Sequence, residues 1–371
     1  MNLSYWEIKS WLTNIDYTVV GSGIVGLNCA LQLKTRFPKA KILILEKGTL
    51  PQGASTKNAG FACFGSLSEI IDDLNNHSET EVLELVKKRV EGLKLLRHSL
   101  GDETINYKEL GGYELFSKNN EAFYQHCISQ KDVINRLLKP IFNDVVFNLK
   151  ENLFNFENIE NLCGFNRFEG QIDTGKMMES LLLKVSSKGI KILNNITVES
   201  FSEGNDSVKL KTNAFEMSTS KLLIATNGFA SQLLGETVSP ARAQVLITKP
   251  IKNLHIKGTF HLDEGYYYFR NIDDRILFGG GRNLDFEGEE TTELAQTSLI
   301  QNKLESLLKQ TILPNTPFEI EHRWSGIMGV GNKKKAIVKQ ISNNVFCGVR
   351  LGGMGVAIGS LVGKELADLA Q

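Results

Sequence analysis

The sequence has few of the residues that stabilise small secreted proteins. Its 371 residues include five cysteines, which are scattered, odd in number and without C-x-x-C spacing. This pattern argues against a disulfide framework or a cysteine-based zinc site and favours a reducing, cytoplasmic location. The six histidines lack metal-ligand spacing as well, so we expect no metal site.

An excess of one charge is also missing. Lys and Arg together number 42, as do Asp and Glu, so no net charge attracts the chain to nucleic acid or to an anionic membrane. The longest basic run, residues 333–335, is typical of a solvated turn. No apolar run reaches membrane-spanning length and the first residues do not resemble a signal peptide, so we expect neither a transmembrane segment nor a nucleic-acid partner.

The first part of the chain alternates strand and helix. Apolar runs predict strands at 17–20 and 41–46, and the segment between them predicts a helix at about 24–37, ended by Pro38. Strand, helix and strand within about thirty residues form a βαβ unit, which implies a parallel sheet. The length is sufficient for two domains.

After the first βαβ unit, the sequence no longer alternates regularly between strand and helix. Helices are predicted at about 79–100, 119–138 and 174–187, the last with Asp173 as its N-terminal cap. Alternating segments predict an antiparallel sheet with strands at 244–249, 265–270 and 275–280. The chain ends with a strand, a glycine-rich turn and a helix, as it began. We therefore expect an α/β start within an overall α+β fold, in which one domain interrupts another.

Three glycines mark the turn between the first strand and the first helix. Gly21, Gly23 and Gly26 fit G-x-G-x-x-G directly after a strand and before a helix, and Glu46 ends the second strand. This context favours a dinucleotide whose pyrophosphate meets the helix N-terminus and whose ribose meets the acid. The carboxylate of Glu46 would repel a phosphate on the 2′-hydroxyl of the ribose, which argues against a cofactor that carries one. The alternative is a tight turn with no ligand.

Five further motifs, in a fixed order, distinguish a flavin from a nicotinamide. They are GASTKNAGF at 53–61, LLIATNG at 222–228, YYYFR followed by RILFGG at 266–280, RWSGI at 323–327 and GGMGVAIG at 352–359. From about residue 16 to its end the chain resembles the D-amino-acid oxidase family of FAD-dependent oxidoreductases, which includes glycine, sarcosine and γ-glutamylputrescine oxidases. A nicotinamide site would not need the long second loop or the last glycine cluster.

The resemblance implies a Rossmann-like FAD-binding domain interleaved with a substrate domain built on an antiparallel sheet with helices. We expect the FAD-binding domain to comprise residues 1–84, 156–234 and 321–371, and the substrate domain residues 85–155 and 235–320. It also implies noncovalent FAD, because the WSGIMGVG segment, where relatives attach FAD through cysteine, has none.

The cofactor residues implied by the resemblance fall into five groups. They are Gly21, Ser22, Gly23, Ile24, Val25 and Gly26 at the pyrophosphate; Glu46, Lys47 and Val198 at the ribose and adenine; Gly53, Ala54, Ser55, Thr56, Asn58, Ala59 and Gly60 toward the isoalloxazine; Thr226, Asn227 and Gly228 at the middle; and Gly352, Gly353, Met354, Gly355 and Val356 at the pyrimidine end of the ring.

Candidates for the substrate come from strand alternation and from the resemblance. Tyr266, Tyr268 and Arg270 alternate onto one face, where a guanidinium and two phenols could meet a substrate; ordinary aromatic packing is the alternative. The resemblance places Arg323 and Arg350 near the ring, although relatives often carry a small residue at the second position. Lys57 is either a cation that favours oxygen activation or a solvated loop lysine.

The implied reaction is oxidation of the C–N bond of an amino acid or secondary amine by hydride transfer to the flavin. The product is an imine that hydrolyses, and oxygen or a quinone would reoxidise the flavin. Two alternatives remain open: a 2-hydroxy-acid oxidase or dehydrogenase of the same fold, and a noncatalytic flavoprotein module.

Overall fold

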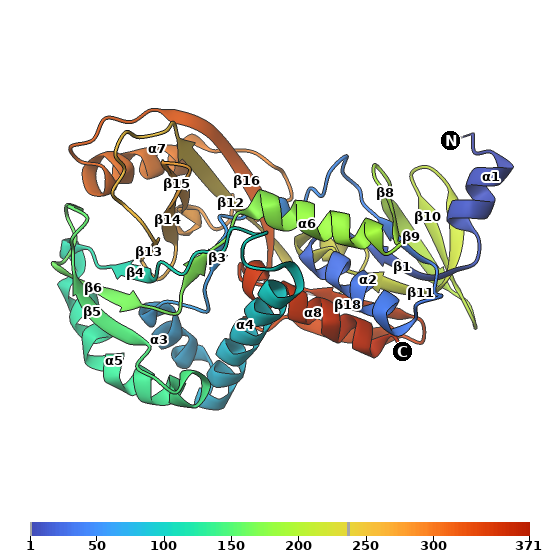
Figure 1. Cartoon of the computed structure of the whole chain (residues 1–371), viewed down its shortest axis with the longest axis horizontal. Helices are drawn as coiled ribbons and strands as arrows, with labels where there is room; N and C mark the ends of the chain where they lie inside the picture. The colour runs from blue at the N-terminus through green and yellow to red at the C-terminus, as the bar shows by residue number, and fades with distance from the viewer. Residues whose placement is uncertain (1, 236–237) are drawn as a thin grey trace.

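The computed structural model describes residues 2–235 and 238–371. The chain forms two halves, each built on its own eight-stranded sheet (Figure 1). Both chain ends lie in the half on the right of that view, together with α6 (Thr174–Ser187). Segments distant in sequence therefore share one sheet, as expected for a domain that another one interrupts.

The first sheet has the strand order β17-β18-β11-β1-β2-β8, with β10 pairing to β11 and β9. Its strands are β1 (Ile15–Val20), β2 (Ile42–Leu45), β8 (Lys191–Leu193), β9 (Val198–Glu203), β10 (Val208–Thr212), β11 (Glu216–Ile224), β17 (Ile337–Ser342) and β18 (Val345–Val349). The pairs along the path from β8 to β18 are parallel, which confirms the predicted parallel sheet.

Helices cover one face of this first sheet. Apolar side chains of α2 (Ile24–Arg36), α6 and α8 (Gly355–Leu369) form a core with those of β1 and β2. The predicted cap of α6 is confirmed, because Asp173 Oδ1 accepts a hydrogen bond of 2.9 Å from the amide of Lys176. A short helix, α1 (Tyr5–Glu7), and a π-helical turn at Ile8–Leu12 precede the sheet.

The second sheet has the order β16-β12-β15-β14-β13-β4-β6-β5. Its strands are β4 (Gly112–Leu115), β5 (Phe147–Glu151), β6 (Leu162–Asn166), β12 (Ser239–Thr248), β13 (Thr259–Leu262), β14 (Tyr267–Ile272), β15 (Arg275–Gly280) and β16 (Ile320–Val330). The antiparallel pairs β12–β15 and β14–β15 confirm the antiparallel sheet predicted from the alternating segments. No bounds were predicted for β5, β6, β13 or β16.

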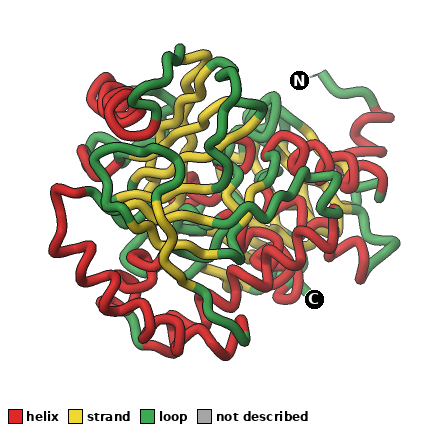
Figure 2. The backbone as a smooth tube through the Cα atoms, turned by 60° about the vertical axis from the view of Figure 1, so that its left-hand side comes forward, coloured by secondary structure: helices red, strands yellow, loops and turns green. Residues whose placement is uncertain are grey.

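The remaining elements surround this second sheet or link the two halves. They are the helices α3 (Leu67–Asn76), α4 (Glu79–Leu100), α5 (Glu121–Phe142) and α7 (Ser298–Leu307), the strand pair β3 (Phe61–Ala62) and β7 (Gly170–Gln171), and the short helical turns η2 (Ala54–Thr56), η3 (Lys118–Asn120), η4 (Asn227–Gln232), η5 (Arg282–Leu284) and η6 (Leu308–Ile312). Strands occupy the middle of Figure 2 and most helices lie at its edge.

The two faces of the second sheet differ because side chains alternate along each strand. Phe260, Phe269 and Phe278 point to one face, where they pack with α7 in an aromatic core. Tyr268 and Val245 point to the other face, which we call the inner face, and belong to a smaller apolar cluster with Ala59. The inner face is the one available to a ligand.

The strand pairing can be compared with the predicted domain ranges, although it does not define where each domain begins and ends. β6 and all but the first residue of β16 fall within ranges assigned to the FAD-binding domain, yet both strands pair in the second sheet. Residue 1 and residues 236–237, which the ranges include, lie outside the described residues. Within the described part of the chain, no helix is both long and apolar enough to cross a membrane.

Helix α4 packs closely against α8 through Gly92. A Cβ atom at Gly92 would lie 2.1 Å from the carbonyl oxygen of Ala357. Alanine favours a helix over glycine by about 1 kcal/mol, but overpacking typically costs about 1–3 kcal/mol. We therefore expect G92A to lower the free energy of unfolding in urea, despite the better propensity.

Gly204 provides a matched control for this substitution. A Cβ atom there would have the Ser207 carbonyl oxygen as its contact, at 3.5 Å, so G204A should change stability by less than about 0.5 kcal/mol. A G92A protein as stable as the wild type would contradict the close α4–α8 packing.

Candidate cofactor and substrate site

One large cavity lies between the two halves. Its volume is about 530 Å³, within the range of small-molecule sites. Val20, Leu45 and Ala225, at the carboxyl ends of parallel strands or just past them, line one part of it, and the inner face of the second sheet lines another. The carboxyl ends of parallel strands are where open α/β sheets bind ligands.

The glycine turn before α2 is compact, and side chains at two of its positions would collide with the backbone. Gly21 has φ of 103°, and a Cβ atom there would lie 2.8 Å from the Ala225 carbonyl oxygen. A Cβ atom at Gly26 would lie 1.9 Å from the carbonyl oxygen of Gly21. Only glycine fits at these positions, so strand and helix approach each other closely and the start of α2, at Ile24 and Val25, lines the cavity.

Glu46 has a structural role in this turn. Its side chain is buried, and Oε2 accepts hydrogen bonds from the amide (3.0 Å) and hydroxyl (2.7 Å) of Ser22. Its Oε1 accepts a third bond, of 3.0 Å, from the amide of Gly48. Glu46 also lines the cavity, so a ribose hydroxyl would share a carboxylate that already fixes the turn.

The predicted second loop closes on the same helix. The hydroxyl of Ser55 accepts a hydrogen bond of 2.9 Å from the amide of Ile24, the first residue of α2. The hydroxyl of Thr56 instead donates to the carbonyl of Pro51, at 2.7 Å. The loop therefore joins the glycine turn, although Ile24 and Ser55 are 31 residues apart in sequence.

A second helix, α8, also begins at the cavity. Gly352 and Gly353 have φ of 58° and 83°, a conformation that turns the chain from β18 into the helix. The side-chain oxygen of Asn227 accepts a bond of 3.1 Å from the amide of Leu351 and holds this turn. Two helix N-termini, each with partial positive charge, thus face one cavity.

An unpaired polar atom indicates that this part of the cavity accommodates a ligand. Within the described residues, the buried hydroxyl of Thr226 has no hydrogen-bond partner, and Thr226 lines the cavity. A buried hydroxyl without a partner is costly. A cradle of glycines, two helix N-termini and an unpaired hydroxyl fit a dinucleotide.

The structure brings most of the predicted cofactor residues to this cavity. Those that line it are Gly21, Gly23, Ile24, Val25, Glu46, Lys47, Gly53, Ala54, Ser55, Asn58, Ala59, Gly60, Val198, Thr226, Asn227, Gly352, Gly353, Met354, Gly355 and Val356. Ser22, Gly26, Thr56 and Gly228 do not line it. A Cβ atom at Gly228 would lie 2.4 Å from the carbonyl oxygen of Met328, so this glycine permits close backbone packing.

At the other end of the cavity, one row of side chains crosses the inner face. His261 pairs with Tyr268, Tyr268 with Gly279, and Gly279 with Val245 on adjacent strands. The Tyr268 ring lies over Gly279, where a Cβ atom would meet its hydroxyl at 2.8 Å. Burial raises the pKa of Tyr268 to about 12, so its phenol stays neutral. Tyr266 lines the cavity too.

The predicted arginines lie elsewhere. Arg270 is buried two residues beyond Tyr268, about 7 Å along the strand, and does not line the cavity. Arg323 points to α7, where it binds Gln301 (2.6 Å) and Glu305 (2.7 Å).

Arg350 and Lys57 differ in placement. The guanidinium of Arg350 donates to the carbonyl of Lys335, at 3.1 Å for Nη2, and does not line the cavity. Its φ of 62° is a conformation that favours glycine. Lys57 lines the cavity, and its carbonyl accepts a bond of 2.9 Å from Trp324.

A buried ion pair lies beside the tyrosines. His261 Nε2 is 2.6 Å from Oε1 of Glu169, and His261 lines the cavity. Burial alone would lower the pKa of His261, but Glu169, with smaller contributions from Glu69 and Glu114, raises it to about 9. The site therefore holds a buried imidazolium at neutral pH.

Sequence reasoning missed this pair and three neighbouring residues. His261 lines the cavity, as do the three neighbours Phe61, Glu264 and Arg282. One signal was available for His261. The segment LDEGYYYF, with a turn at Asp263–Gly265, is typical of a hairpin, and its pairing would have placed His261 opposite Tyr268. Nothing in the sequence indicates Glu169, which is far away in the chain.

Comparisons with known proteins agree with this geometry. A family model described as FAD-dependent oxidoreductase (DAO) matches residues 16–369. A search of curated protein sequences finds no match.

Solved structures match over nearly the whole chain. Glycine oxidase from Geobacillus kaustophilus has a TM-score of 0.77 at 17% identity, covering 96% of this chain and 94% of its own. L-proline dehydrogenase from P. horikoshii has a TM-score of 0.75 at 19% sequence identity, and the match covers 96% of this chain and 93% of the other. Iminodiacetate oxidase from Chelativorans sp. BNC1 has a TM-score of 0.75 at 18% sequence identity, and the match covers 95% of this chain and 94% of the other. These likenesses show the fold.

The His261–Glu169 pair predicts a pH dependence of stability. The folded-state pKa of His261 lies above the ordinary value of 6.5, at about 9, so protonation favours the folded state. Relative to H261Q, the wild type should have its full extra stability below pH 6.5 and lose it as the pH rises through about 9.

Urea unfolding across this pH range measures the difference in the free energy of unfolding between wild type and H261Q, which should change by roughly 3 kcal/mol. H126Q, which alters an exposed histidine of α5, is the control and should show no such trend. A difference between wild type and H261Q that stays constant from pH 6 to pH 10 would contradict the buried imidazolium.

Proposed function

The chain belongs to the D-amino-acid oxidase family of FAD-dependent oxidoreductases, and from this we propose that it oxidises the C–N bond of an amino acid or secondary amine. The product is an imine that hydrolyses in water. FAD supplies the acceptor for the two electrons and the hydrogen. The observation that carries the proposal is the cavity of about 530 Å³, which joins both glycine-rich helix starts to a row of tyrosines.

The named activities of the structural neighbours support this choice. Glycine, proline and iminodiacetate each present a C–N bond beside a carboxylate. None of the three named substrates is a 2-hydroxy acid. The fold alone does not select the atom oxidised, so the proposal depends on the substrate end of the cavity.

We assign the cofactor to the end lined by the two helix starts. The amide of Gly23 and the partial positive charge at the start of α2 would hold the pyrophosphate, Glu46 the ribose, and residues 352–356 the pyrimidine end of the ring. Binding would be noncovalent, because burial raises the pKa of the cavity thiol Cys63 well above its ordinary value and keeps it protonated.

The substrate end would be built by the inner face. The neutral phenol of Tyr268 can donate a hydrogen bond and Tyr266 lies nearby, while Phe61 and Val245 exclude water. Phe61 contacts the Tyr268 ring edge to face, with 5.6 Å between centroids, which fixes both rings. For the electron acceptor we propose oxygen or a quinone, and for the location the cytoplasm.

Thr226 provides a test of the cofactor end. T226V removes the unpaired hydroxyl at nearly constant shape, so the apoprotein should be no less stable, while its Kd for FAD should rise about fivefold. T18V is a matched control. The hydroxyl of Thr18 is likewise buried and without a partner within the described residues, but Thr18 does not line the cavity.

Titration of the apoprotein with FAD, followed by flavin fluorescence, gives both Kd values. T18V should bind FAD within about twofold of the wild type. Equal affinities for T226V and wild type would contradict the assigned position of the cofactor.

A substrate panel tests the reaction itself. We expect the visible flavin absorption of the purified protein to bleach anaerobically with one member of a panel of sarcosine, glycine, L-proline, D-amino acids and γ-glutamyl amines. Ammonia or a free amine should appear in the product. Bleaching by 2-hydroxyglutarate alone, with a keto acid as product, would overturn C–N oxidation in favour of a 2-hydroxy-acid enzyme.

A further inference from the structure

Arg282 is the arginine that lines the cavity; among residues 2–235 and 238–371, no other does. Arg323 and Arg350 bind groups outside the cavity, and Arg270 is buried behind its wall. A guanidinium for the substrate must therefore come from a residue outside the sequence motifs.

The backbone after β15 places Arg282 beside a tyrosine of the site. Gly280 and Gly281 have φ of 124° and 81°, and the amide of Gly281 donates a bond of 2.9 Å to the carbonyl of Tyr266. A Cβ atom at Gly280 would lie 2.0 Å from that same carbonyl oxygen. Two glycines thus turn the chain tightly enough for Arg282 to begin η5 next to Tyr266.

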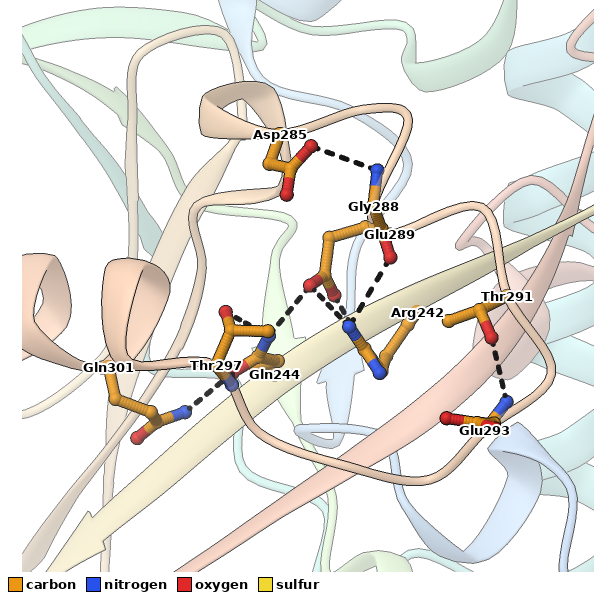
Figure 3. A network of polar contacts seen from close by, with 9 residues as sticks. All are labelled: Arg242, Gln244, Asp285, Gly288, Glu289, Thr291, Glu293, Thr297 and Gln301. Atoms are coloured by element: carbon orange, nitrogen blue, oxygen red, sulfur yellow. Dashed lines mark hydrogen bonds and ion pairs between the residues drawn. The ribbon is translucent and has the colours of Figure 1, made fainter.

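The loop that carries Arg282 is fixed to β12 by a buried network (Figure 3). Glu289 is fully buried and accepts two hydrogen bonds of 2.8 Å from Arg242. It also accepts one of 2.9 Å from Gln244, whose own oxygen accepts the amide of Thr297 at 2.9 Å. Two points of the loop are anchored, which reduces the freedom that Arg282 would lose on binding.

The guanidinium itself has no anionic partner. Within the part of the chain that the structure describes, it makes no hydrogen bond or ion pair, and its carbon lies 4.7 Å from the centre of the Phe286 ring. Burial lowers the pKa of Arg282, opposed by Tyr266 and by two glutamates of the loop. An arginine still carries its charge, and a partly desolvated charge without a partner favours an anionic ligand.

Two other cations at the substrate end are already paired. Lys334 lies 3.0 Å from Asp72 and 2.6 Å from Asp73, and the imidazolium of His261 is bound to Glu169. The cavity is also lined by the carboxyl group of Glu264, so it presents both signs of charge. A zwitterion matches this distribution better than a simple amine does.

We propose that Arg282 binds the carboxylate of the substrate, and that the substrate is an α-amino acid or an N-substituted one. The planar guanidinium can donate two parallel hydrogen bonds to a carboxylate. This inference rests on the proposed function, which it narrows from amines in general to amino acids.

Propionate and propionamide, which differ in charge but hardly in size, test the inference without turnover. Each is titrated into the FAD-loaded protein while the visible flavin spectrum is followed. We expect the wild type to bind propionate more tightly than propionamide. R282Q should raise the Kd of propionate by at least about tenfold and leave that of propionamide unchanged, with R282K between them.

R275Q is the matched control, because Arg275 starts β15, the strand that precedes Arg282, and pairs with Glu321 outside the cavity. It should leave the Kd of propionate unchanged, and equal FAD content shows that each variant is folded. Propionate binding that is absent in the wild type, or equal in wild type and R282Q, would overturn the inference. Arg282-dependent binding without turnover of any amino acid would sustain Arg282 as the carboxylate-binding residue and count against the proposed oxidation of an amino acid instead.

Discussion

The close contact between α2 and α8 determines how the cavity is built. A Cβ atom at Gly363 would lie 2.6 Å from the carbonyl oxygen of Val25, and one at Gly359 would lie 2.7 Å from the side chain of Ile24. Because the helices touch nearly backbone to backbone, both can begin at the same place. Their N-terminal amides and partial positive charges therefore act on one ligand rather than on two.

Features formed by residues close together in sequence could be predicted, whereas contacts between distant segments could not. The turn at Gly21–Gly26 is local, since its flanking strand and helix lie directly beside it in sequence, and the apolar runs of the βαβ unit are local as well. The cap of α6 by Asp173 is equally local. The pairing of β18 with β11 is not local. The strand, glycine turn and helix at each end predicted that both ends belong to one domain, and the resemblance placed the C-terminal glycines at the same cofactor as the first ones.

The substrate end was harder to predict for a physical reason. Alternation places Tyr266, Tyr268 and Arg270 on one side of a strand, but it does not say how far along that side the cavity extends. The functional charges are also set by partners that are distant in sequence. Glu169 makes His261 a cation, and Glu289 fixes the loop of Arg282 through Arg242. Such pairs become visible only when the sheet is assembled.

A crystal structure of the purified protein with FAD would test the account most directly. We predict density for a noncovalent dinucleotide that runs from Glu46, past Thr226, to Gly352–Val356, with its ring facing Tyr268. FAD that lies elsewhere, or a cavity that stays filled with solvent at saturating FAD, would contradict the central claim that the two helix starts and the tyrosine row form one site.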